Sequence, residues 1–531
     1  MGGRAFLRFA AALGFQALQL GPQGETTPYD PSPYNATLFS RSTVSVSAGR
    51  LVEEGLLPGE ALAAAIASRP DGALLRASHA YAHPAMARLL AAAWQEHRGD
   101  RELQGRIRQF VTRHGEWIER AAPPGTGREE IEAYRFGQLL AHEQHDAFRA
   151  EARGLGLRLS GDLQIGIPQR DLATYRSLLL STLAMGAPPS RTNPEGQAWG
   201  YGVLDPDLYG TPAAPGAALE LVRARARKLL REFDGIRVDH PHGLIDPWVY
   251  PASDPDPARA VQRGARLFSS PEHGELSRWA IPRPEQIDAG EPAHADGRVR
   301  ELTPAQVERY AILFDALVDA AREAGSGVDE LIPEVLSTQP YPVRRVLERH
   351  GLGRFRVTQK AAMHDPGDVY RAENARREDW IMVGTHDTEP IWRAAERWVG
   401  TGVAPARAAY LAGRLVSDER ERPQWAERTA ASPLALARAE LANLFAGPAA
   451  NVMIFFPDLL GLREVYNRPG TVSAENWSLR VPPDFAAQYP RAAREGRALH
   501  LPAALATAIR ARGKSFAEAQ RGLLEQLERH A

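Results

Sequence analysis

Residues 219–239 read LELVRARARKLLREFDGIRVD, and this stretch sets the pattern that decides the fold. Its first part carries apolar residues at the spacing of one helix face, at Leu219, Val222, Ala226, Leu229 and Leu230. The apolar run Gly235-Ile-Arg-Val-Asp239 follows and is typical of a short buried strand. A helix that leads directly into a buried strand is one repeat of a parallel α/β fold.

The same pattern recurs along the chain. Helix-like segments such as Pro304–Ala324 and Leu434–Phe445 separate short apolar runs that end in polar residues. This many repeats favours a (β/α)8 TIM barrel over an open doubly wound sheet. Seven strands are recognised instead of eight, and the missing first strand would belong before Gly3. The seven runs are Phe15–Leu20, Leu157–Ile167, Gly235–Asp239, Glu330–Glu334, Arg356–Gln359, Ile381–Asp387 and Asn451–Phe456.

Two intervals are too long to be simple loops of a single barrel over residues 1–531. Residues 50–150 are predicted to be a helical insertion between the first two visible strands. Residues 241–301 are rich in Pro, Asp and Arg, and are predicted to form a loop-rich excursion at the active-site face. The helices predicted in the insertion are Gly59–Ala67, Met86–His97, Arg101–His114 and Glu129–Arg153.

Composition excludes several classes of protein. The formal net charge is −1, without the basic surplus that a nucleic-acid partner would need. There is no cysteine, which excludes disulfides and thiol nucleophiles and fits a reducing cytoplasm. No apolar run is long enough to span a membrane. The N-terminal stretch is predicted to be an amphipathic helix instead of a signal peptide, with apolar residues at Phe6, Leu7, Phe9, Ala10 and Leu13.

Three predicted strands end in an acid, at Asp239, Glu334 and Asp387. In a TIM barrel the chemistry takes place at the carboxyl ends of the strands. Retaining glycoside chemistry needs a nucleophilic carboxylate and a protonated carboxyl roughly 5 Å apart. Arg237 precedes Asp239 by two residues, so it shares a strand face with Asp239 and is expected to keep it ionised. Glu334 would need a raised pKa. Any one of these acids could be a helix N-cap, but the three together favour catalysis.

At these residues the sequence resembles the 4-α-glucanotransferases, also called amylomaltases or disproportionating enzymes, of the α-amylase clan. Arg237-Val-Asp239-His240, Pro333-Glu334-Val-Leu-Ser and Gly384-Thr-His-Asp387 resemble the three short motifs that carry the acids of that family. The resemblance implies that Asp239 is the nucleophile, Glu334 the general acid/base and Asp387 the carboxylate that stabilises the transition state. It also implies that no cofactor or metal is required.

Further blocks of the same family follow in order along nearly the whole chain. Ser32-Pro-Tyr34 resembles the block whose Tyr stacks on the donor sugar, and Ser160-Gly-Asp162 resembles a strand at the donor site. Gly196-Gln-Ala-Trp199-Gly200 resembles a mobile loop on the acceptor side, so Trp199 is a candidate sugar-stacking residue. The remaining blocks are Leu20-Gly-Pro22, Gly186-Ala-Pro-Pro189, Asn467-Arg-Pro-Gly470 and Asn476-Trp477-Ser-Leu-Arg480.

Two residues are less closely defined by these motifs. His386 is a candidate hydrogen-bond partner of a sugar hydroxyl because it precedes Asp387. Asp458 follows the last predicted strand, where an N-cap and a sugar contact are both open. His142-Glu-Gln-His145 has two histidines at i, i+3 but no third ligand nearby, and is therefore interpreted as a polar helix face instead of a metal site.

The sequence departs from the family pattern beside the acids. Ser190, Val335 and Thr388-Glu389 stand where the family usually has acidic or amide residues. The segment Asp239-His-Pro-His-Gly-Leu-Ile-Asp-Pro247 is more similar to maltooligosyltrehalose synthases. These differences leave the acceptor open.

The resulting prediction is a retaining enzyme that transfers α-1,4-glucan segments to a glucan or glucose. An α-glucan hydrolase, an isomerase of the maltooligosyltrehalose-synthase type and an inactive glucan-binding protein are the alternatives. The protein is expected to be cytoplasmic, a monomer or homodimer, with maltooligosaccharides as its partners and neither nucleic acid nor membrane among them.

Overall fold

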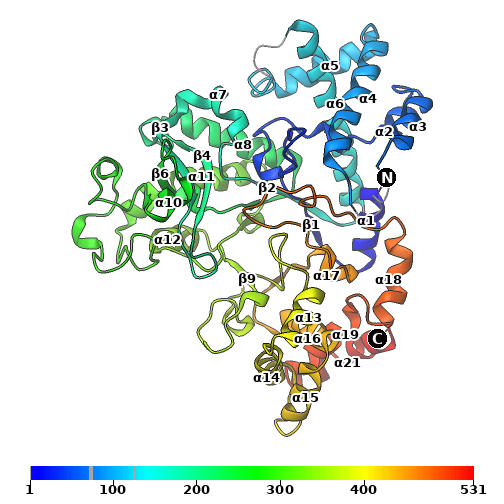
Figure 1. The fold of residues 1–531 in the computed structure, drawn as a ribbon, viewed down its shortest axis with the longest axis vertical. Helices are drawn as coiled ribbons and strands as arrows, with labels where there is room; N and C mark the ends of the chain where they lie inside the picture. The colour runs from blue at the N-terminus through cyan, green and yellow to red at the C-terminus, as the bar shows by residue number, and fades with distance from the viewer. Residues whose placement is uncertain (1, 71–75, 123–126, 531) are drawn as a thin grey trace. The chain divides into compact units, whose positions relative to one another are not determined.

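The computed structural model describes residues 2–70, 76–122 and 127–530 (Figure 1). The chain forms two compact units, Met1–Leu352 and Gly353–Ala531. Each unit contains a parallel sheet with helices between its strands. All seven predicted strands are present, and within each of the two sheets neighbouring strands are parallel, so the parallel α/β class predicted from the sequence is confirmed.

The parallel sheet of the first unit has four strands in the order β1-β2-β5-β8. The four strands are short: β1 Ala17–Gln19, β2 Arg158–Leu163, β5 Gly235–Val238 and β8 Leu331–Pro333. The register pairs Asp162 on β2 with Arg237 on β5. Chain order and spatial order agree among these four strands, so their carboxyl ends lie along one edge.

Helices cover this sheet as the apolar spacing predicts. In α8 (Ala217–Glu232), Leu219, Val222, Ala226 and Leu230 are buried in the core that also holds Ile236 and Val238 of β5. A capping box at Thr303 and Gln306 begins α11 (Pro304–Glu323), which packs against α8. The other helices of the first unit outside the insertion are α1 Gly2–Ala12, α7 Leu172–Tyr175, α9 His242–Ile245, α10 Pro257–Gln262 and α12 Tyr341–Arg349.

The insertion predicted at residues 50–150 is helical. Figure 1 shows α4, α5 and α6 gathered as a group within the first unit, and α6 contacts both α4 and α5. The group has a core of its own that includes Trp94, Ile107, Phe136 and Leu140. Its helices are α2 Ala48–Glu53, α3 Gly59–Ala67, α4 His79–His97, α5 Arg101–His114 and α6 Arg128–Gly154.

The first unit also contains an antiparallel sheet that the sequence analysis did not predict, in the order β4-β3-β6-β7. Its strands are β3 Leu179–Ala187, β4 Gln197–Leu204, β6 Trp248–Pro251 and β7 Ala265–Arg266. Part of the predicted excursion at 241–301 and the predicted mobile loop around Trp199 are therefore strands. Their glycines and prolines resemble loop sequence, but β3 pairs with both β4 and β6, and cross-strand pairing outweighs weak local preference.

The second unit has a three-stranded parallel sheet in the order β11-β10-β9: β9 Phe355–Val357, β10 Trp380–Met382 and β11 Asn451–Val452. The helix α16 (Pro433–Ala446) is buried along most of its length and contacts α13, α14, α15 and α19. The helices of this unit are α13 Ile391–Gly400, α14 Ala404–Leu415, α15 Arg422–Ala430, α16, α17 Phe456–Leu460, α18 Phe485–Arg494, α19 Leu501–Ala511, α20 Lys514–Ala519 and α21 Arg521–Arg529.

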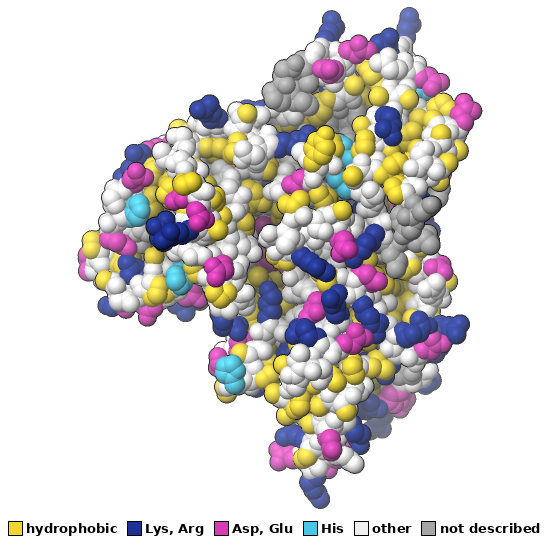
Figure 2. All heavy atoms as spheres, viewed as in Figure 1, with side chains coloured by type: hydrophobic (Ala, Val, Ile, Leu, Met, Phe, Trp, Pro, Cys, Tyr) yellow, Lys and Arg dark blue, Asp and Glu magenta, His cyan; other side chains and the backbone are white. Residues whose placement is uncertain are grey.

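Charges of both signs are interspersed on the face shown in Figure 2, as expected for a net charge of −1. Among the described residues, no helix is both long and apolar enough to cross a bilayer. The predicted N-terminal helix is present as α1, and its Leu7 and Ala10 are buried against Leu157 and Phe233.

Candidate active site

Arg237 lies at the centre of a buried cluster of acids in the first unit. Its Nη2 contacts Oε2 of Glu334 at 2.6 Å and Oδ1 of Asp239 at 3.1 Å. Asp239 follows the last residue of β5, and Glu334 follows the last residue of β8. Because neighbouring parallel strands end at the same edge, the two predicted carboxylates meet there. The contact between Arg237 and Asp239 also fits their predicted i, i+2 placement on one strand face.

The other half of the guanidinium holds Asp162. Nη1 of Arg237 donates to both carboxylate oxygens of Asp162, at 2.8 and 2.7 Å, and the side chain of Asp162 is fully buried. The hydroxyl of Tyr34 donates to Oδ2 of Asp162 at 3.0 Å and lies 3.1 Å from Nη1 of Arg237. Because Asp162 accepts hydrogen bonds from both Arg237 and Tyr34, it orients these two side chains.

The two carboxyl groups on Nη2 of Arg237 lie close together in a buried setting. Burial raises the pKa of Asp239 well above its usual value, and the neighbouring Glu334 and Asp162 raise it further, whereas Arg237 lowers it. The direction is opposite to that expected from Arg237 alone, because burial and like charge outweigh the one cation. A hydrogen bond between Glu334 and Asp239 raises the pKa of Asp239 further.

The residue after Asp239 has a strained backbone. His240 has φ of 40°, and among the described residues only it and Trp477 are non-glycine residues with positive φ. Its ring meets Trp199 of β4 edge to face, with centroids 4.8 Å apart. Burial lowers the pKa of His240 to about 4. Strain of this kind is kept at functional sites when the surrounding structure enforces it.

Trp199 is half-buried at the start of β4. Its Nε1 donates to Oε1 of Gln197 at 2.9 Å, and the centroids of the Trp199 and Tyr201 rings are 5.9 Å apart. The predicted sugar-stacking residues Tyr34 and Trp199 are therefore both in the unit that holds Asp239, but on different elements. Tyr34 lies in a 3-10 turn, Pro33–Asn35.

The second unit carries the third predicted acid. Asp387 is exposed in the loop after β10, and the Asn467 amide donates to its Oδ1 at 2.7 Å. Nε2 of His386 is 3.5 Å from the same oxygen. The ring of His386 contacts Trp477, the second strained residue, with φ of 62°. Asn467 and Trp477 were part of a sequence motif, but their contacts with this pair could only be found in the structure.

Asp458 has a different setting from the other acids. It is buried in α17, its carboxylate accepts the amide of Ile391 at 2.7 Å, and its carbonyl accepts Nε1 of Trp392. Burial raises its pKa to about 7. Asp458 is not the N-cap of its own helix, which is Phe455, but its carboxylate accepts the first amide of α13. We therefore leave Asp458 out of the sugar-binding set proposed below.

The departures from the family pattern have local partners. Val335 is buried in the core of the first unit. The hydroxyl of Thr388 accepts the amide of Thr385 at 2.9 Å and closes the turn that carries His386. Ser190 bonds Asn193 in the turn between β3 and β4. Val335 therefore packs in the core, whereas Thr388 and Ser190 stabilise the turns in which they lie.

The histidines of α6 are buried. Nε2 of His142 lies 3.2 Å from Oε1 of Glu232, and Nε2 of His145 donates to the Glu232 carbonyl at 2.8 Å. Lys228 and Arg41 also pair with Glu232. The interpretation as a polar helix face is thus wrong, because these side chains form a buried ionic cluster. Among the described residues, no group of three or more His, Asp or Glu could hold a metal ion.

The first unit thus places a pair of carboxylates on one arginine at the ends of parallel strands. The sequence model of the 4-alpha-glucanotransferase family matches residues 125–486, which is more than half of the chain. The chain belongs to this family.

One curated relative is the 4-alpha-glucanotransferase of Thermus thermophilus, 29% identical over 135 residues. That alignment covers 24% of this chain and 26% of the relative, so the match spans about a quarter of the relative's length.

Solved structures extend the likeness of fold to nearly the whole chain. The amylomaltase of Streptococcus agalactiae in complex with acarbose aligns with a TM-score of 0.69 at 16% identity, covering 94% of this chain and 95% of that one. The amylomaltase of Corynebacterium glutamicum aligns with a TM-score of 0.63 at 19% identity, covering 93% of this chain and 71% of that one. The chain therefore has the amylomaltase fold.

Proposed function

We propose that this protein is a 4-α-glucanotransferase that moves α-1,4-glucan segments to a glucan or glucose acceptor with retention of configuration. The observation that carries the proposal is the pair Asp239 and Glu334 on Nη2 of Arg237. Family membership supplies the substrate class, and the chemistry of the pair supplies the mechanism.

The spacing of the pair supports retention. An oxygen of Asp239 and an oxygen of Glu334 contact the same nitrogen, at 3.1 and 2.6 Å. Retaining enzymes have carboxyl groups about 5–5.5 Å apart, whereas inverting enzymes leave about 6.5–9.5 Å for a water. Two acids bridged by one nitrogen leave no such room. This favours direct attack by one of them on the sugar.

In the proposed reaction Asp239 attacks C1 of the donor glucose while the bond from C1 to the bridging O4 breaks. Glu334 gives its proton to O4, and the shortened glucan leaves. The donor segment is then an ester on Asp239. Glu334, now ionised, takes a proton from the acceptor hydroxyl, whose oxygen attacks C1 and releases Asp239. In this proposal Asp239 is ionised and Glu334 is protonated when the donor glucan is bound.

The other residues have supporting roles in the proposal. Arg237 stabilises charge on the pair, and Asp162 holds Arg237. We propose that Tyr34 and Trp199 offer ring faces to sugars, and that His386 and Asp387 bond sugar hydroxyls more strongly in the transition state. The anchoring of Asp387 by Asn467 supports a fixed orientation for that carboxylate.

We also propose that the seven parallel strands belong to one (β/α)8-type barrel, the fold predicted from their number and alternation. The amylomaltase fold supports this, and a crystal structure would test it. A cytoplasmic location is proposed from the absence of cysteine, and a monomer or homodimer is the proposed assembly.

The test is incubation of the purified protein with maltotriose, followed by chromatography of the products. Transfer gives glucose together with a ladder of longer oligosaccharides. The Asp239→Asn variant should lose the ladder, whereas Asp319→Asn, a change in an exposed acid of α11, should keep it. Glucose and maltose without longer products would show a hydrolase, and a non-reducing disaccharide end would show the isomerase. Either result contradicts the proposal.

A further inference from the structure

A line of three rings connects β4 with the loop that follows β8. The ring of His240 meets Trp199 edge to face, with centroids 4.8 Å apart, and it also contacts the ring of His242, with centroids 4.4 Å apart. Nε2 of His242 donates to the carbonyl of Thr338 at 3.0 Å. Because Thr338 lies in the loop between β8 and α12, these three residues, here called the ring line, join β4 to the loops that follow both proposed catalytic acids.

His242 is held firmly by the core. It is 5% exposed and begins α9, whose apolar side chains Leu244 and Ile245 are in the core of the first unit. A Cβ atom on Gly243 would lie 2.6 Å from Cγ1 of Ile165, so α9 packs as closely as glycine allows on the segment after β2. Because α9 has little room to shift, the imidazole of His242 is a fixed point for the groups that it contacts.

The strained residue His240 lies between two such groups. Besides His242 it contacts Trp199, whose Nε1 donates to Gln197 at 2.9 Å. The amide of Gly243 donates to the carbonyl of His240 at 3.0 Å and closes the turn. Burial lowers the pKa of His240 to about 4, so its ring is neutral at pH 7 and packs against the other two rings without burying a charge. These contacts hold its backbone at the positive φ of 40°.

The loop after β8 is held at several other points. The hydroxyl of Ser337 is 3.5 Å from that of Thr192, and the amide of Gln339 donates to Oδ2 of Asp296 at 2.8 Å. These contacts tie the loop to the turn between β3 and β4 and to residue 296. The bond from α9 to Thr338 is different, because it ties the loop to the turn that follows the proposed nucleophile. It therefore helps to set the placement of the two acid-bearing loops relative to each other.

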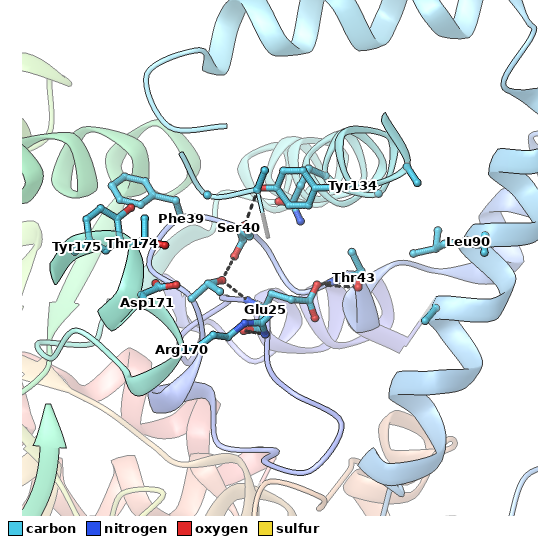
Figure 3. Close-up of a pocket in the computed structure, with 18 residues that line it drawn as sticks. Glu25, Phe39, Ser40, Thr43, Leu90, Tyr134, Arg170, Asp171, Thr174 and Tyr175 are labelled. Carbon is cyan, nitrogen blue, oxygen red and sulfur yellow. Dashed lines mark hydrogen bonds between the residues drawn. The ribbon is translucent and has the colours of Figure 1, made fainter. Parts of the chain in front are cut away.

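The ring line is separate from the cavity of about 320 Å³ in the same unit (Figure 3). The lining of that cavity includes residues of α4 and α6, and Figure 3 shows Tyr134, Glu25 and Arg170 beside it. None of the three rings borders it, and neither does Thr338. Substitutions in the ring line therefore leave the walls of the cavity unchanged, and their effects can be assigned to the side of the acids.

We propose that His242 is a positioning residue that favours a glucan over water as the acceptor. The inference deepens the function proposed above and rests on it, because it concerns the second half of that reaction. In that step the acceptor oxygen attacks C1 of the ester on Asp239, the bond between C1 and Asp239 breaks, and the acceptor proton passes to Glu334. A glucan hydroxyl gives a longer glucan, whereas water gives hydrolysis.

The two acceptors differ in how much they depend on the ring line. A sugar hydroxyl is fixed by the rest of its molecule, here by the proposed stacking on Trp199, so it attacks well only when that ring and Glu334 are correctly placed relative to each other. Water is small and reaches C1 in many orientations. A loop that moves away from His242 also admits more water to the ester. Loss of the His242 contacts should therefore slow transfer more than hydrolysis.

Two substitutions at this position separate the ring from the hydrogen bond. His242→Phe keeps a ring against His240 but cannot donate to Thr338, and His242→Gln keeps a donor but loses the ring. The full chain of each variant is incubated with maltotriose. Transfer makes longer oligosaccharides without changing the number of reducing ends, whereas each hydrolysed bond adds one reducing end. The ratio of new reducing ends to longer oligosaccharides should rise about fivefold in His242→Phe and by a smaller factor in His242→Gln.

His145→Phe is the matched control. Nε2 of His145 also donates to a backbone carbonyl, that of Glu232 at 2.8 Å, and the centroids of the His145 and Phe233 rings are 4.9 Å apart. The change removes the same kind of bond from a buried histidine of the same unit, away from the acids. It should lower the melting temperature and leave the ratio unchanged, because a loss of fold stability alone reduces both reactions together.

An unchanged ratio in His242→Phe, or an equal rise in His145→Phe, would overturn the inference. A folded His242→Phe protein that forms no product would also overturn it, since that result would place His242 in formation of the ester and not in the choice of acceptor. Should His242→Phe not fold in thermal melts, the same comparison is made with His242→Gln, whose ratio must exceed that of the wild type. A wild-type protein that forms no longer oligosaccharides contradicts the transfer reaction itself, so the two failures can be told apart.

Discussion

Arg237 and Asp162 are direct register partners on β5 and β2, and one guanidinium nitrogen donates to both oxygens of the Asp162 carboxylate. The pair is almost fully buried. It fixes one end of the guanidinium, so the other end is aimed at Asp239 and Glu334. The position of the two acids therefore depends on a residue that belongs to neither of their strands.

Asp162→Asn removes the charge from this pair but keeps its shape. We expect the free energy of unfolding to fall by about 3 kcal/mol, because Arg237 is left buried with less compensation. We expect kcat to fall on the order of 100-fold, because the guanidinium is no longer held in place. Urea denaturation and the maltotriose assay measure the two effects. A variant with normal kcat would show that Asp162 does not position Arg237.

Asn467 is predicted to position Asp387 through its amide. Asn467→Ala should lower kcat by about tenfold with little change in melting temperature, because a single partly exposed hydrogen bond is lost. Asn467→Asp should be worse, since two carboxylates would then face each other at the distance of that bond. Steady-state kinetics of both variants test this order. Equal activity of the Ala and Asp variants would argue against an electrostatic role.

Asp458 is predicted to support structure and not sugar binding. Its folded-state pKa of about 7 lies above the ordinary value for Asp, so the folded state binds the proton more tightly than the unfolded state. Its contribution to stability is therefore present at acidic pH and is lost as pH rises from about 4 through about 7. Asp458→Asn should flatten this dependence in thermal melts and leave kinetic constants unchanged. A raised KM for maltotriose would restore the sugar-binding interpretation.

The buried histidines are expected to lower the free energy of unfolding as the pH becomes acidic. Burial lowers the pKa of His145 to about 3 and that of His114 to about 4, whereas unfolded histidine titrates near 6.5. The unfolded chain thus binds more protons between these values, and stability falls as pH drops from about 6.5 toward 3.

His145→Gln removes one titrating group but keeps a side-chain amide that can donate to the Glu232 carbonyl. The slope of the unfolding free energy against pH should therefore fall by up to about 1.4 kcal/mol per pH unit, the value for one proton. Denaturant melts from pH 7.5 to 5 measure the slope. An unchanged slope would show that His145 does not titrate on unfolding.

The parallel strands were predictable because each is an apolar run at a boundary between helix and loop. The helix α5 has the bounds predicted from its apolar spacing, and α4 begins seven residues earlier because Ser78 caps it, accepting the Tyr81 amide. The antiparallel sheet was not predictable, because β3 and β4 contain glycines and are stabilised by partners far along the chain.

The acids were predictable from their places at strand ends, but their electrostatics were not. Sequence spacing puts Arg237 beside Asp239, and a single nearby cation predicts a lowered pKa. The number of acids that share that cation depends on which strands are neighbours, and this is known only once β2, β5 and β8 are placed side by side. The contact between Asn467 and Asp387 joins residues 80 positions apart and has no local signal.

The most direct measurement of the central claim is to trap the ester on Asp239. The Glu334→Gln variant is incubated with α-glucosyl fluoride, whose leaving group needs no proton, and is then digested and analysed by mass spectrometry. The account predicts a glucosyl group on the peptide that contains Asp239, because attack proceeds while release without the base is slow. A glucosyl group on a different acid, or turnover without any labelled peptide, would contradict it.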